Sequence, residues 1–310
     1  MLDLITFVTA LYVRVDDYCK AELEPERRRP GPMPALSRSE VVTLGCFTQW
    51  LRFLGERDAY GYVGRHLRRE FPRLPDRSQF NRHLRQHVDA IQGFGLNQAA
   101  RAGAQAAPYE VMDCMAVVTR NYKRRGLGWL PGQAAVGFSN RVGWFEGFRL
   151  LLSVTPSGII TGYGIGSGNV NDRPLADTFL AARRCPQPGL PMVGPPAAGP
   201  YLVDKGFDGR AQRERWHHVY GAKVIGPPQH PPAAARWTKA ARRQFAGWRQ
   251  IVETVNERLL NWWQLNRQRP HTLDGFQARL AAKVALHNFV ICLNKQLGRP
   301  PLALVDLLGC

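Results

Sequence analysis

Acidic residues are scarce in this chain. Its 310 residues contain 24 Asp and Glu against 42 Lys and Arg, which gives a formal net charge of +18. A surface with so large a positive excess attracts polyanions. Most of the excess lies in residues 108–310, so we expect nucleic acid to bind mainly there.

Long hydrophobic runs are also absent. No apolar run reaches the roughly 18 residues that a bilayer-spanning helix needs. The longest, residues 284–293, is interrupted by His287 and Asn288. Residues 1–15 carry Asp3 before their apolar stretch and lack a small-residue cleavage site, unlike a secretory signal. We therefore expect no membrane partner and a cytoplasmic location.

The six cysteines show no paired short spacing and no nearby histidine cluster, which argues against a zinc finger. We expect them to be reduced and mostly buried. A hydrophobic content of 45% is enough for an ordinary core, and the length suggests one large domain and one smaller domain.

Residues 1–107 are expected to form a helical domain for DNA binding or assembly. Apolar residues recur at helical spacing along residues 1–92, and Ser37 with Glu40 predicts a capping box. Ser78 is predicted to cap a further helix, which places Arg82 and Arg85 off its apolar face. The face that carries Arg82 and Arg85 is interpreted with equal weight as a DNA-reading surface or as an ordinary solvated one.

The pattern changes after a segment rich in Ala, Gly and Gln, so we place the domain boundary there and a second domain over residues 108–310. Short apolar runs predict strands, and amphipathic stretches predict helices. The strands are expected at 111–118, 148–154, 159–165, 201–204 and 222–225, and the helices at 172–184, 210–220 and 238–297, the last broken near Pro270. This order is typical of a mixed α/β sheet.

Three acids stand out in the second domain. Asp113 lies inside an apolar strand, Asp204 ends another strand just before Lys205 and a glycine, and Glu253 lies four residues after Arg249 on a helix. Taken singly, Asp113 can satisfy backbone groups, Asp204 can cap the next helix, and Glu253 can pair with Arg249. Together they suit a site in which two divalent ions activate a hydroxyl and stabilise a leaving oxyanion in phosphodiester cleavage.

The chain resembles the DDE transposases of bacterial insertion sequences, over essentially residues 1–297. The segments that carry the resemblance are the strand with Asp113, residues 143–150, residues 168–173, residues 204–207, and Arg249 with residues 251–253. Related transposases space a tyrosine, an arginine, the catalytic glutamate and a lysine along one helix. Here these positions are Ala246, Arg249, Glu253 and Leu260, so two of the four match.

The resemblance implies a ribonuclease H-like catalytic core in which Asp113, Asp204 and Glu253 are both the catalytic and the metal-binding residues. It further implies two Mg²⁺ or Mn²⁺ ions for each active site. The expected partners are double-stranded DNA, as element ends and target, and further copies of the chain in a dimer or higher assembly.

Several basic residues are candidates for DNA contact because Lys and Arg bind phosphate. A basic loop, residues 120–125, contains Tyr122 and is followed by Trp129. These rings suit stacking on unpaired bases, and the alternative is a solvated loop. The candidates are Arg120, Lys123, Arg124, Arg125, Arg149, Lys205, Arg249 and Arg258.

Two other functions fit the same residues. A metal-dependent nuclease of this fold would cut DNA without joining it. A DNA-binding descendant would keep the positive surface without catalysis, although the presence of all three acids argues against it.

Overall fold

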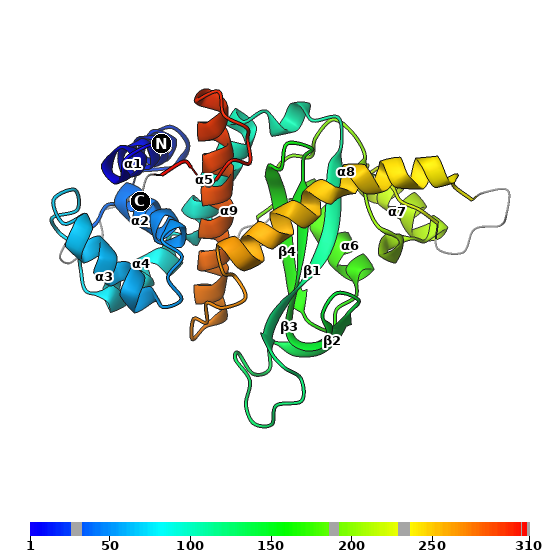
Figure 1. The fold of residues 1–310 in the computed structure, drawn as a ribbon, viewed down its shortest axis with the longest axis horizontal. Helices are drawn as coiled ribbons and strands as arrows, with labels where there is room; N and C mark the ends of the chain where they lie inside the picture. Colours follow the sequence, from blue (N-terminus) through cyan, green and yellow to red (C-terminus); the bar gives the residue numbers. More distant parts are fainter. Residues whose placement is uncertain (26–32, 186–191, 229–235, 305, 309–310) are drawn as a thin grey trace. The chain divides into compact units, whose positions relative to one another are not determined.

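The fold shown in Figure 1 is a computed structural model that describes residues 1–25, 33–185, 192–228, 236–304 and 306–308. The chain forms two compact units, Met1–Gln98 with Asn261–Cys310, and Ala99–Leu260. From sequence, the C-terminal helices were grouped with the catalytic part. Residues 261–310 instead belong to the unit of the N-terminal helices, because the last helix packs against α2 and α4.

The helical unit is built around buried apolar faces. Its helices are α1 (Leu4–Glu22), α2 (Arg38–Trp50), α3 (Glu56–His66), α4 (Arg77–Gln86), most of α5 (Val88–Arg101) and α9 (Leu273–Gln296). The predicted capping box is confirmed, with Ser37 and Glu40 bonding each other's backbone at the start of α2. The predicted cap at Ser78 is wrong. Asp76 caps α4 instead, since its carboxylate accepts from the amides of Ser78 and Gln79.

Helix α9 is buried on all sides, which explains why its sequence shows no one-sided apolar face. Its buried polar groups have partners: Lys283 Nζ donates to Gln49 Oε1 at 2.6 Å, and Asn288 Nδ2 donates to the Gly95 carbonyl at 3.0 Å. Within the described ranges, none of the helices has the length and apolar character of a membrane span.

The second unit contains a six-stranded mixed sheet. Its strands are β1 (Glu110–Arg120), β2 (Ala135–Ser139), β3 (Gly143–Val154), β4 (Ile160–Ser167), β5 (Tyr201–Leu202) and β6 (Val224–Ile225). The order is β2-β3-β1-β5-β6, and β4 also pairs with β3. Strands β1, β3 and β4 are antiparallel neighbours, whereas β5 and β6 run parallel to β1. This confirms the expected ribonuclease H-like mixed sheet.

Strand β2 was missed in the sequence because it is short and contains Gly137. The structure shows why a glycine is needed there: a Cβ on residue 137 would collide with the carbonyl oxygen of Gly168. Strands β2 and β4 therefore lie end to end along the same edge of β3, with the Gly168 amide bonded to the Gly147 carbonyl.

Helices cover both faces of the sheet. Met112 and Leu151 point to one face, where they join the core formed with α6 (Asp172–Arg184) and α7 (Arg210–Tyr220). Side chains alternate along a strand, so Asp113 points to the other face. Helix α8 (Lys239–Glu257) packs on β1 and β3 there, and Figure 1 shows it crossing these strands.

Candidate active site

Two of the predicted acids lie side by side on neighbouring parallel strands, Asp113 inside β1 and Asp204 just after the end of β5. β1 and β5 pair at Glu110 with Tyr201 and at Val111 with Leu202. Asp113 and Asp204 each stand two residues beyond the last pair, so both side chains point to the same face. The sheet register therefore brings the two carboxylates together.

Asp204 also caps the turn that follows it. Its Oδ1 accepts from the Gly206 amide at 2.6 Å at the start of the 3₁₀ turn Lys205–Phe207. The glycine leaves room for carboxylates: a Cβ on Gly206 would lie 2.9 Å from Asp204 Oδ1 and 3.0 Å from Oδ2 of Asp172. Capping and ligand binding are thus compatible for Asp204, because the cap uses one oxygen.

Asp172 is a third acid at this place, and sequence reasoning treated it only as the start of a helix. It opens α6, and its Oδ1 accepts from Arg149 Nη1 at 3.3 Å. Burial raises the pKa of Asp172, and the nearby charge of Asp204 raises it further against the lowering effect of Arg149. The only sequence signal was its position next to Gly168–Asn171, within a segment that carries the family resemblance.

Two side chains of α8 donate hydrogen bonds to the carboxylate of Asp113. Arg249 Nη2 donates to Asp113 Oδ1 at 3.3 Å, and Asn256 Nδ2 approaches Oδ2 at 3.4 Å. The two donors are seven residues apart, about two turns, so they share one side of the helix. Burial raises the pKa of Asp113 to about 7, with Arg249 opposing the rise and Asp204 and Asp172 adding to it.

Glu253 lies one turn beyond Arg249 on α8 and is exposed. The part of the chain that the structure describes contains no group of three His, Cys, Asp or Glu residues arranged to hold a metal ion. Arg249, which the sequence offered as a partner for Glu253, pairs with Asp113. The structure thus brings Asp113 and Asp204 together and carries Glu253 on the helix above them.

The acids that meet here are oxygen donors. The charges of Asp204 and Asp172 raise the pKa of Asp113, and the charge of Asp204 raises the pKa of Asp172, although burial is the larger cause for both. Oxygen ligands of this kind suit Mg²⁺ or Mn²⁺, and a cation between them would offset the repulsion.

The basic candidates divide into paired and exposed side chains. Arg120 is paired, since its Nε lies 2.6 Å from Glu146 Oε2 and its Nη1 donates to the Gly126 carbonyl. Arg149 and Arg249 pair with acids of the site. The exposed group is Lys123, Arg124, Arg125 and Lys205.

Arg258 is the least suited of the candidates to phosphate contact. Its side chain is half-buried in the π-helical turn Arg258–Trp262, and its Nη1 is buried without a hydrogen-bond partner in the described structure. Burial lowers the pKa of this arginine.

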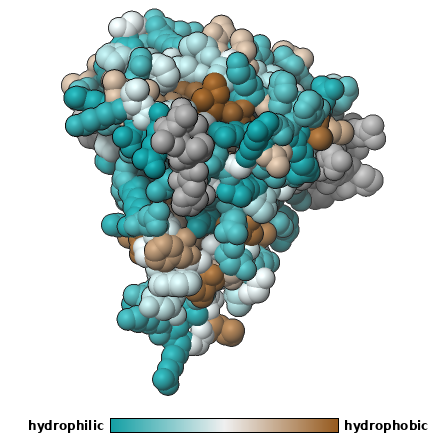
Figure 2. Space-filling model, turned by 90° about the vertical axis from the view of Figure 1, so that its right-hand side faces the viewer, coloured by the Kyte–Doolittle hydropathy of each residue, from teal (hydrophilic) through white to brown (hydrophobic). Residues whose placement is uncertain are grey.

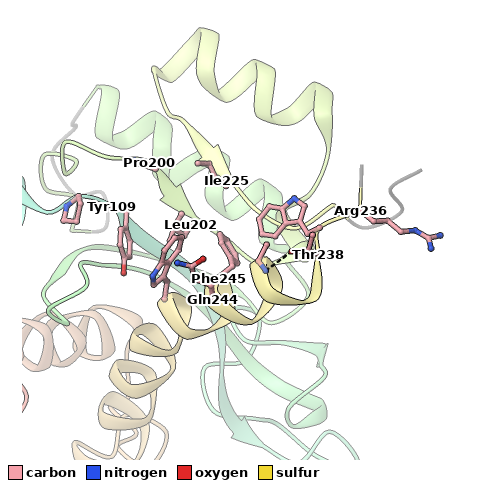
Figure 3. Close-up of a pocket in the computed structure, with 12 residues that line it drawn as sticks. Tyr109, Pro200, Leu202, Ile225, Arg236, Thr238, Gln244 and Phe245 are labelled. Atoms are coloured by element: carbon pink, nitrogen blue, oxygen red, sulfur yellow. Dashed lines mark hydrogen bonds between the residues drawn. The ribbon is translucent and has the colours of Figure 1, made fainter. Parts of the chain in front are cut away.

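A pocket of about 570 Å³ lies on the face of the sheet that α8 covers, and Figure 3 shows the residues that line it. Leu202 lines it two residues before Asp204. Its aromatic walls are the pairs Tyr109 with Trp248 and Trp237 with Phe245, with centroids 6.0 and 5.0 Å apart. Figure 3 shows the Arg236 guanidinium pointing away from the other labelled side chains. The pocket is an apolar neighbour of the site and contains none of its acids.

Comparison with solved structures finds transposase complexes of low similarity. The Mos1 transposase paired-end complex with left transposon end is 15% identical, over 92% of this chain and 86% of that one, with a TM-score of 0.25. The Mos1 mariner paired end complex with Mn is 14% identical, over 91% and 86%, with a TM-score of 0.24. The Mos1 strand transfer complex is 15% identical, over 90% and 84%, with a TM-score of 0.22. No curated protein sequence matches the chain.

The family comparison is decisive. The Transposase DDE domain family matches residues 126–289, which is more than half of the chain. The match includes Asp172, Asp204, Arg249 and Glu253 and begins after Asp113. The chain therefore belongs to the DDE transposase family.

Proposed function

We propose that this transposase cuts double-stranded DNA at the ends of an insertion sequence and joins the freed 3′ hydroxyl to a target strand. The observation that carries the proposal is the register of β1 and β5, which sets Asp113 beside Asp204 under the Arg249 side of α8. Two carboxylates side by side on neighbouring strands, with a third on the covering helix, suit phosphoryl transfer.

Asp113, Asp204 and Glu253 would hold the divalent ions, Mg²⁺ or Mn²⁺, two in each site. Bound there, the ions would supply Lewis acidity to the attacking and leaving oxygens. The chain's own part is to place the carboxylates. Asn256 and Arg249 orient Asp113, and the Gly206 amide orients Asp204. DNA phosphate oxygens would complete the ligand set, as is usual for Mg²⁺.

The exposed cations Lys123, Arg124, Arg125 and Lys205 are the best-placed phosphate contacts among the candidates, because their charges are free to face a polyanion. The paired side chains of Arg120, Arg149 and Arg249 and the half-buried side chain of Arg258 are weaker candidates, since a paired or buried guanidinium must first leave its surroundings. The assembly on DNA would be a dimer or larger, working in the cytoplasm where bacterial DNA lies.

The test uses the full chain with Mg²⁺ or Mn²⁺ and a supercoiled plasmid that carries the DNA flanking its own gene. The variants are Asp204→Asn and, as a matched control, Asp17→Asn, which changes an exposed aspartate of α1. We expect metal-dependent nicks and joins from the unaltered chain and the control, and none from Asp204→Asn.

Sequencing the products separates the other functions. Cleavage without joined DNA would show a nuclease. Binding without cleavage by the unaltered chain, on plasmids that carry both flanks, would show a non-catalytic DNA-binding protein. Equal activity of Asp204→Asn and the unaltered chain would remove Asp204 from the site.

A further inference from the structure

An exposed group of aromatic rings lies on the sheet away from the acids. It consists of Tyr122, Phe138 and Trp144, which we call the aromatic platform. Phe138 and Trp144 are a cross-strand pair of β2 and β3 with ring centroids 5.6 Å apart, and Tyr122 lies 6.3 Å from Trp144. The exposed fractions are 39% for Tyr122, 47% for Phe138 and 57% for Trp144. Single exposed rings are common, whereas exposed apolar side chains that lie together mark an interaction surface.

A loop with three cations lies next to the platform. Lys123 Nζ lies 5.9 Å from the centre of the Tyr122 ring, and Arg124 and Arg125 follow it in the same exposed loop. In the lower part of Figure 2, where the β1–β2 connection and the β2–β3 hairpin lie, hydrophobic side chains are interspersed with hydrophilic ones. Rings next to cations match a strand whose bases are apolar on their faces and whose backbone is anionic.

The backbone around the platform is tied down by arginine side chains. Arg120 fixes the loop by pairing with Glu146 and by donating to the Gly126 carbonyl at 2.7 Å. Arg149 donates to the carbonyl of Phe138, and Arg141, in the turn between β2 and β3, pairs with Glu257 of α8. Rings on such a frame are already in place before a ligand arrives, so binding costs little ordering entropy.

We propose that the aromatic platform, with Lys123, Arg124 and Arg125, binds unpaired nucleotides of the DNA substrate. The rings stack on base faces, which are covered inside a duplex, and the cations contact the phosphates. A second copy of this chain fits the platform less well, because it would bring the same cations opposite one another.

Trp144 of the platform lies on β3, the β-strand that runs to the active site. Trp144 is eight residues from Leu152, which pairs with Asp113. Eight residues of strand span about 27 Å, which equals about eight stacked nucleotides at roughly 3.4 Å each. The platform would therefore contact the DNA strand about eight nucleotides from the phosphodiester bond that is cut. This inference rests on the proposed function only in taking DNA as the ligand.

The test is fluorescence anisotropy without metal, using a labelled oligothymidylate of about 12 nucleotides and a hairpin duplex. The variant Trp144→Ala should bind the single strand about tenfold more weakly, and Trp144→Phe should keep most of the affinity because a ring remains. The matched control is Trp248→Ala, which removes a tryptophan of comparable exposure, 45%, outside the platform. It should bind as the unaltered chain does.

The cations give a second readout. Changing Lys123, Arg124 and Arg125 to glutamine should flatten the salt dependence of single-strand binding by about 0.7 for each lost phosphate contact. Unchanged affinity in both Trp144→Ala and Phe138→Ala would overturn the proposal. So would a dimer of the unaltered chain that becomes monomeric in Trp144→Ala without any change in DNA affinity.

Failure of this inference is distinguishable from failure of the proposed function. Asp113→Asn should lose cleavage yet bind the oligothymidylate normally. Trp144→Ala with full cleavage and full binding would leave the acids as the active site and remove only the platform.

Discussion

Replacing Asp113 by asparagine removes a carboxylate that the fold keeps in unfavourable surroundings. The pKa of Asp113 rises from 3.8 to about 7, chiefly through burial. Arg249 lowers this pKa, but only in part, and the charges of Asp204 and Asp172 raise it further. The folded chain thus binds this proton more tightly than the unfolded chain does. The proton on Asp113 therefore stabilises the folded chain fully below about pH 4, and this stabilisation is lost as the pH rises through 7.

The size of the effect follows from that change. At about 1.36 kcal/mol per pH unit, the rise corresponds to a loss on the order of 4 kcal/mol between about pH 4 and pH 8. Asparagine resembles the protonated carboxyl and does not titrate. We therefore expect Asp113→Asn to match the unaltered chain near pH 4 and to melt higher near pH 8. The difference is about 8 to 16 °C if each kcal/mol shifts melting by about 2 to 4 °C.

The assay is thermal unfolding from about pH 4 to pH 8 in a chelator, repeated with Mg²⁺. A divalent cation should stabilise the unaltered chain by about 2.7 kcal/mol at a concentration 100 times its Kd and should have less effect on the variant. A variant that melts at or below the unaltered chain near pH 8 in chelator would refute the reasoning, because the carboxylate would then be stabilised overall by Arg249.

Three further outcomes follow from other contacts of the fold. Arg183→Met should lower the free energy of unfolding, measured with denaturant, by about 3–5 kcal/mol. It leaves the carboxylate of Glu110 buried without its cation, since the side chains of this pair are only 3% and 1% exposed. Lys283→Met should raise the melting temperature more at about pH 7 than at pH 10, since burial lowers the pKa of Lys283 and the fold is penalised when the lysine is charged. Gly206→Ala should reduce plasmid cleavage about 10- to 100-fold by displacing the neighbouring carboxylates. Its control, Gly64→Ala, adds a methyl group into open space and should cleave normally.

Local patterns were enough to predict several elements with their bounds. The helices at 172–184 and 210–220 were predicted with the bounds that α6 and α7 have, because their polar and apolar residues alternate at helical spacing. The capping box at Ser37 was predicted because its two partners are only three residues apart. The cap of α4 was mistaken because Ser78 and Asp76 are both good capping residues, and only the backbone path decides between them.

Long-range packing decided what the sequence could not. Of the two rings expected from sequence to be available for stacking, Tyr122 is exposed, whereas Trp129 packs edge-on against Phe148. The other exposed rings of this region, Phe138 and Trp144, were not predicted. Their exposure depends on how β2 pairs with β3, and that pairing was invisible in a five-residue strand with a central glycine.

The sequence by itself determined that the chain is a basic, mixed α/β protein of the DDE type, because charge, periodicity and short motifs are local properties. Only the tertiary structure decided that Asp172 joins Asp113 and Asp204, that Arg249 pairs with Asp113, and that α9 belongs to the helical unit. These facts depend on sheet register and helix packing, which bring together residues far apart in the chain, and no local pattern encodes which distant residues will meet.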